Sequence, residues 1–241
     1  MKTNLIKLTC GTALLGTMAV AATNCAQAQS FIDLGSSGPT PGPNDISQLS
    51  TNGNTAWPNR PDGLNYYTDN NPAPGQTFTT GTDAMYLVSV AIRTAGLNSG
   101  GGYGTPASTP TYYLSIYSMS GSTATLLNTF SAPNPGFTDG DWLQWNGLSV
   151  ALAANQTYAY AFGSQPSGGG YAAMAVATDN TYAGGEMALI PISGGTSATG
   201  GSHSFDAVFD LGLNASPVPE PFTLALAGLG GLGLLFFRRR K

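Results

Sequence analysis

The sequence predicts an all-β domain built as an antiparallel sandwich of two sheets. Between residues 73 and 214, short runs of aromatic and β-branched residues alternate with clusters of Gly, Pro, Asn and Ser. Several of these runs alternate in polarity with a period of two, which is typical of half-buried strands. The helix formers Lys, Glu and Arg are almost absent from the same region, and no helical period is found there.

About nine strands are expected in this domain, each bounded by turn-forming residues. Tyr112, Leu114 and Ile116 share one face of their run, so that face should be buried. The short Ser-Gly-Ser segment at 120–122 indicates a hairpin between two runs. The expected strands are residues 76–80, 85–93, 111–118, 124–131, 148–152, 157–163, 171–178, 185–191 and 205–213.

The region before the domain has a different composition. Residues 29–72 are rich in Gly, Pro and Asn and carry only isolated apolar residues. We expect an irregular segment with one edge strand at most, packed on the domain of residues 73–214 or linked to it.

The charge balance excludes one class of partner. Between residues 29 and 216 there are eleven acids against Arg60 and Arg93, a formal charge of 2 − 11 = −9. Nucleic-acid binding needs clustered Lys and Arg, so no nucleic-acid partner is expected. Cys10 and Cys25 precede the expected mature protein, which excludes a disulfide or a thiolate zinc site in it.

The first 28 residues have the organisation of a secretory signal peptide. Lys2 and Lys7 flank an apolar run over 8–22, and Ala26 and Ala28 form a small-x-small cleavage site. A first transmembrane helix is the weaker alternative, because the run is short and interrupted by Thr and Gly. Export through the inner membrane is therefore expected.

Residues 215–241 have three parts in a fixed order. A Pro-Glu-Pro box is followed by uncharged residues 222–237 and then by a basic cluster. As a helix the uncharged part would be about 24 Å long, enough for a single transmembrane helix if the ~30 Å hydrocarbon core thins locally. The basic cluster should stay cytoplasmic. The sorting residues are Val218, Pro219, Glu220, Pro221, Arg238, Arg239 and Arg240.

This arrangement resembles the PEP-CTERM sorting signal of Gram-negative bacteria. The resemblance implies recognition by an exosortase, which would cut near the Pro-Glu-Pro box and release or transfer the domain to the cell surface or extracellular matrix. It also implies an association with exopolysaccharide and biofilm production. A plain tail anchor with a proline-rich hinge is the alternative for the same residues.

The domain itself resembles the jelly-roll domains of exported and carbohydrate-binding proteins. The resemblance rests on residues 75–79, on 141–145 leading into 148–152, and on 154–158, where strands turn through short polar corners into aromatic strands. It implies a jelly-roll-like sandwich.

Few residues suggest catalysis, and we expect no enzyme. The only histidine, His203, lies in a Gly and Ser loop, and no Gly-x-Ser-x-Gly elbow is present. A glycoside hydrolase needs only two carboxylates, so that reaction stays as a less favoured alternative.

Two acidic sets are candidate ion ligands. Asp139 and Asp141 flank a glycine, so both carboxylates could face one Ca²⁺, although a polar β-turn explains the same residues. Asp206 and Asp210 lie four apart in a strand pattern, as surface charges or as a second oxygen pair.

Aromatic residues are the candidate sugar contacts, because sugar C–H faces pack on aromatic rings. We single out Trp142, Trp145 and Tyr182. The two tryptophans are three apart and should point to opposite sides of a strand, so at most one is a binding platform. The expected function is association with extracellular polysaccharide. A structural matrix protein or an adhesin that binds another protein is the alternative.

Overall fold

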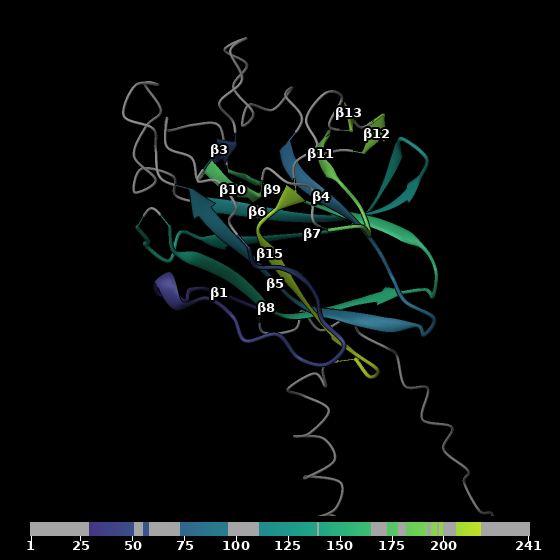
Figure 1. Ribbon diagram of the computed structural model, residues 1–241, viewed down its shortest axis with the longest axis horizontal. Helices are drawn as coiled ribbons and strands as arrows, with labels where there is room; N and C mark the ends of the chain where they lie inside the picture. The colour runs from purple at the N-terminus through teal and green to yellow at the C-terminus, as the bar shows by residue number, and fades with distance from the viewer. Residues whose placement is uncertain are drawn as a thin grey trace, which may run out of the picture.

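The computed structural model describes residues 29–50, 55–57, 73–95, 111–138, 140–164, 173–177, 182–191, 194–196, 198–199 and 206–217. These ranges hold fifteen strands and one short 3-10 turn, η1 (Gly35–Ser37). The strands form two antiparallel sheets that pack face to face (Figure 1). The all-β, two-sheet fold expected from the sequence is confirmed.

Each sheet draws its strands from the whole length of the domain. Sheet I contains β1 (Ser30–Asp33), β2 (Ile46–Gln48), β3 (Thr55–Trp57), β5 (Met85–Ala95), β8 (Trp142–Leu152), β10 (Ala173–Ala177), β14 (Asp206–Ala207) and β15 (Phe209–Asn214). Sheet II contains β4 (Ala73–Thr79), β6 (Thr111–Ser120), β7 (Thr123–Pro133), β9 (Thr157–Ser164), β11 (Met187–Ile190), β12 (Gly195–Thr196) and β13 (Ala198–Thr199).

The connectivity is that of a jelly roll. In sheet I, β8, β5, β15 and β2 are neighbours in that order, and in sheet II the order is β7, β6, β9 and β4. The chain crosses between the sheets from β2 to β4, from β4 to β5 and from β5 to β6, and later from β7 to β8 and from β8 to β9. Such crossings generate two Greek keys, which define the jelly roll.

The N-terminal segment takes a larger part in the fold than the single edge strand expected. β1 pairs with β8 at one side of sheet I, and β2 pairs with β15 at the other. Residues 34–45, named here the N-terminal strap, therefore cross the outer face of sheet I. Leu34 donates its backbone N–H to the Trp142 carbonyl at 2.8 Å and packs in a small outer cluster with Ala91 and Val208.

β8 begins six residues earlier than the sequence indicated. Asn146 and Gly147 suggested a break, but the strand runs through them. Against β5 the register jumps between Leu87 and Ser89, which pair with Val150 and Asn146. Gly147 accommodates this irregularity with a φ of 73°, a conformation that glycine adopts without steric cost.

The main core lies between the two sheets and is rich in aromatic rings. Phe31 of β1 stacks on Trp145 of β8 with ring centroids 4.4 Å apart, and Tyr112 stacks on Phe162 at 5.2 Å. The expected inward face of β6 is confirmed, since Tyr112 and the alternate residues after it are fully buried. Apolar burial of this extent is the dominant stabilising contribution to the fold.

Candidate functional site

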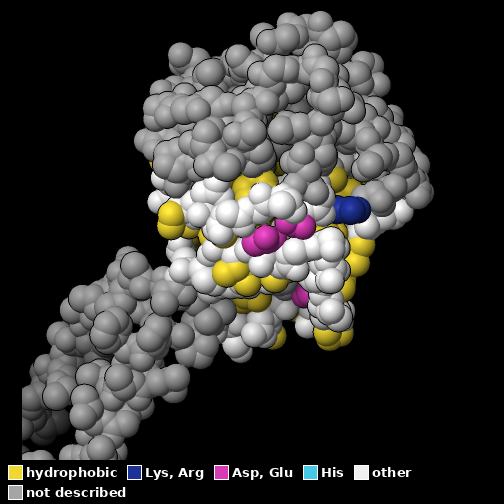
Figure 2. All heavy atoms as spheres, turned by 90° about the vertical axis from the view of Figure 1, so that its left-hand side faces the viewer, with side chains coloured by type: hydrophobic (Ala, Val, Ile, Leu, Met, Phe, Trp, Pro, Cys, Tyr) yellow, Lys and Arg dark blue, Asp and Glu magenta, His cyan; other side chains and the backbone are white. Residues whose placement is uncertain are grey.

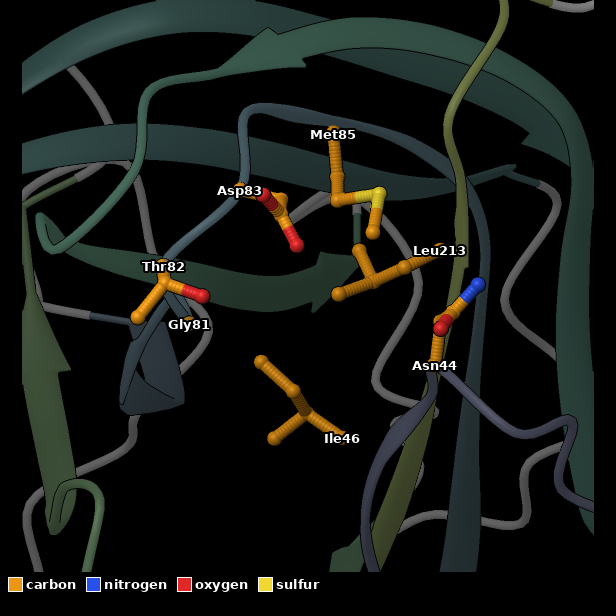
Figure 3. A pocket seen from close by; sticks show the side chains of 7 residues that line it. All are labelled: Asn44, Ile46, Gly81, Thr82, Asp83, Met85 and Leu213. Atoms are coloured by element: carbon orange, nitrogen blue, oxygen red, sulfur yellow. The ribbon is translucent and has the colours of Figure 1, made fainter.

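An open pocket lies at one end of the sandwich, where three distant segments meet (Figure 3). Its volume is about 270 Å³. Residues 44 and 46 come from the end of the strap and the start of β2, 81–85 from the turn between β4 and β5, and 213 from the end of β15. The jelly-roll connectivity brings these segments together, because β2 and β5 both pair with β15. The lining residues are Asn44, Ile46, Gly81, Thr82, Asp83, Met85 and Leu213.

The pocket combines an apolar wall with a polar rim. The side chains of Ile46, Met85 and Leu213 converge on the cavity, and the Asp83 carboxylate and the Thr82 hydroxyl face the same space (Figure 3). Asp83 is exposed, so its carboxylate is open to a ligand. Such a lining can accept and donate hydrogen bonds to a polyhydroxyl ligand and can pack against its C–H groups. Sequence reasoning missed this pocket, because its residues share no motif.

The turn at residues 138–141 occupies its carboxylate internally. Asp141 Oδ2 accepts hydrogen bonds from the Thr138 backbone N–H at 2.8 Å and from the Thr138 hydroxyl at 2.6 Å. These bonds lower the pKa of Asp141, the hydroxyl contributing most. Gly140 has a φ of 92°, which the tight turn requires.

The same turn is fixed onto β5. The Thr94 hydroxyl donates to the Asp141 carbonyl at 2.8 Å and accepts from the Gly140 N–H at 3.0 Å, and Arg93 Nε donates to the Gly140 carbonyl at 3.2 Å. Asp139 lies outside the described residues. Within the described ranges, no group of three His, Cys, Asp or Glu side chains gathers in a way that could hold a metal ion. Calcium binding by Asp139 and Asp141 therefore stays a prediction.

The two tryptophans point to opposite faces of β8, as the spacing indicated, and both rings are buried. Trp145 is fully buried in the main core, and Trp142 is 5% exposed beneath the strap. A sugar needs an accessible ring face to stack on. In this arrangement neither tryptophan presents such a face.

Tyr182 belongs to a polar group that joins the two sheets. Its ring packs edge-on against Phe209 at 5.3 Å, and its backbone N–H donates to Asp206 Oδ2 at 2.8 Å. Burial raises the pKa of the Tyr182 hydroxyl. Gln76 of β4 donates to Asp206 Oδ1 at 3.0 Å and accepts from the Ala207 N–H at 2.8 Å.

Asp206 and Asp210 are both buried, at 0% and 4% exposure, so the interpretation of them as surface charges is wrong. Asp206 bonds across to sheet II through Gln76, whereas Asp210 lies on the outer side of β15, between the inward-facing Phe209 and Leu211. Their partners differ, so the two carboxylates do not act as one oxygen pair. Burial of this kind depends on the strap and on the sheet register, which the sequence pattern does not reveal.

Asp210 faces a second carboxylate from the end of the strap. Asp45 accepts hydrogen bonds from the Gly42 N–H at 2.6 Å and from the Leu213 N–H at 2.9 Å. Asp210 Oδ1 has no hydrogen-bond partner. Burial, and to a smaller extent the charge of Asp45, raises the pKa of Asp210 to about 6.

The described surface carries little positive charge. Seven acidic residues stand against a single basic one, Arg93, in the described ranges. Figure 2 shows acidic side chains near the middle of one face, with a basic side chain at its edge. This surface would repel an anionic ligand unless a cation bridged the two.

Comparison with known families assigns the C-terminal part of the chain. A family described as the PEP-CTERM protein-sorting motif matches residues 217–241, which are 25 of the 241 residues. The chain carries a PEP-CTERM sorting motif. The motif indicates an exported protein that is transiently anchored in the membrane and then processed by an exosortase. No match was found among the curated proteins or among the solved structures.

The two terminal signals themselves are not part of the structural description. Residues 218–241, with the Pro-Glu-Pro box and the arginines, and residues 1–28, with Ala26 and Ala28, lie outside the described residues. The signal peptide, its cleavage site and the single transmembrane helix stay predictions. Across the ranges that the structure does describe, no helix is long and apolar enough to cross a membrane.

Proposed function

We propose that the jelly-roll domain of this exosortase-sorted protein binds extracellular polysaccharide and catalyses no reaction. The observation that supports the proposal is the pocket of Figure 3, with the Asp83 carboxylate and the Thr82 hydroxyl beside an aliphatic wall. Sugar hydroxyls pair with carboxylate, amide and hydroxyl groups, and the C–H faces of a sugar ring pack on apolar side chains.

The size and charge of the pocket narrow the ligand. A volume of about 270 Å³ suits a short unit of a chain, not a long groove-bound stretch. The acidic surface favours a neutral polysaccharide, or an anionic one bridged by Ca²⁺. Asp83 is the only carboxylate in the lining of this pocket, which favours binding over the two-carboxylate chemistry of a glycoside hydrolase.

A pull-down with the exopolysaccharide of the producing organism tests the proposal. The full chain is incubated with the polymer with Ca²⁺ and again with a chelator, and the retained fraction is measured. Asp83→Asn should lower retention about tenfold, since a charged hydrogen bond to a hydroxyl contributes ~1.5–3 kcal/mol. Asp33→Asn, an equal change of charge at an exposed residue of β1, should leave retention unchanged.

The outcomes separate the alternatives. Equal retention of the two variants would remove the pocket from the proposal, and no retention in either buffer would remove polysaccharide binding altogether. Loss of retention on chelation would support the bridging ion. A structural matrix protein is the second candidate, favoured by the exposed edge of β7.

A further inference from the structure

Strand β7 offers an uncovered edge in sheet II. It pairs with β6 along its whole length, but with β12 only at Thr123 and Ala124. Among the described residues, 125–133 have no other strand partner. The side chains of 125–129, 131 and 133 are exposed. An edge strand of this kind presents a row of N–H and C=O groups to any strand that can align with it.

The edge is regular over its C-terminal half and apolar beside it. The register with β6 shifts by one residue between Ile116 and Tyr117, which leaves Leu127 as the extra residue of a bulge. Residues 128–133 beyond the bulge keep a continuous register with β6. Leu126 and Leu127, at the start of this stretch, are 39% and 42% exposed.

The charge of the chain singles out this edge for a second copy of the same molecule. No Asp, Glu, Lys or Arg occurs between residues 94 and 138, a stretch that includes all of β6 and β7. Elsewhere the domain is acidic, so two copies repel each other. Protein edge strands are commonly protected by lysine, and β7 has none.

We propose that β7 pairs antiparallel with β7 of a second copy, over residues 128–132, and joins the two copies of sheet II into one continuous sheet. A two-fold axis near Phe130 makes the contact self-complementary. It also brings Leu127 of each copy next to Pro133 of the other, so the exposed leucines become covered. The contact uses none of the residues that line the pocket, so it is independent of polysaccharide binding.

Sedimentation of the full chain in detergent, over a range of protein concentrations, tests the pairing. Leu127→Asp places two like charges close to the contact and should raise the dimer dissociation constant at least about tenfold. Leu49→Asp is the matched control, because Leu49 is 40% exposed and follows β2 in the other sheet. It should leave the dissociation constant unchanged. A monomer at every concentration, or equal weakening by both substitutions, would overturn the proposal.

Hydrogen exchange gives a readout that needs no variant. In the parent protein, the amides of residues 128–132 that face away from β6 should exchange more slowly as the protein concentration rises. Protection that does not depend on concentration would contradict the pairing. Leu127→Asp should also keep its polysaccharide retention, which separates a failure of this contact from a failure of the pocket.

Discussion

Replacing Asp210 by asparagine should stabilise the protein at neutral pH. The carboxyl group is 4% exposed, its Oδ1 has no hydrogen-bond partner, and its pKa is raised from 3.8 to about 6. The folded protein therefore keeps the Asp210 proton up to about pH 6, whereas the unfolded chain releases it near pH 4. The free energy of unfolding consequently falls as the pH rises through this window, and the loss is complete above it.

The size of the effect follows from the pKa difference. A difference of roughly two pKa units between the unfolded and folded states corresponds to about 3 kcal/mol at pH 7. At pH 4 the folded and unfolded states bind nearly the same number of protons, so the cost is below ~1 kcal/mol. Asp210→Asn removes the charge at nearly constant shape. It should therefore gain as much as about 3 kcal/mol at pH 7 and almost nothing at pH 4.

The assay is urea unfolding at pH 4, 5, 6, 7 and 8, followed by tryptophan fluorescence. Trp145 is fully buried and stacks on Phe31, so its emission reports the loss of the core. Asp83→Asn, the same change at an exposed residue, is the control and should shift stability little at any pH. A gain for Asp210→Asn that is equal at pH 4 and pH 7, or absent at pH 7, would refute the reasoning.

Three further substitutions should destabilise the core. Gly75→Ala places a Cβ against the Tyr160 carbonyl oxygen of β9, and the displaced strand pairing should cost at least about 2 kcal/mol in thermal or urea unfolding. Gln76→Leu leaves the buried Asp206 without one of its hydrogen-bond donors and should cost about 2–3 kcal/mol, where an unchanged unfolding midpoint would contradict the role of this bond. Trp145→Ala empties a fully buried site and should cost about 3–5 kcal/mol in the same experiment.

Local patterns were enough to predict the strands and the sorting motif. The alternation around Tyr112 and the turn at 120–122 depend only on neighbouring residues, so the β6–β7 hairpin could be expected from the sequence. The order of the Pro-Glu-Pro box, the uncharged span and the basic cluster is likewise contiguous, and the family match covers these residues.

The pocket could not be predicted in this way. Asn44, Asp83 and Leu213 are separated by long stretches of chain and share no motif. They meet because β2 and β5 pair with the same strand, β15, which is a matter of sheet order. The tryptophans illustrate the same limit, since spacing placed them on opposite faces of β8 but could not show that the strap covers the outer one.

The sequence by itself determined the all-β class, most of the strand positions and the sorting route, because periodicity and terminal motifs are properties of contiguous residues. The tertiary structure decided which polar groups are buried. Asp210 has the composition and spacing of a surface acid, and it loses its water only because the strap crosses sheet I and brings Asp45 beside it. Solvation depends on neighbours from distant parts of the chain, and the local pattern of a strand does not contain them.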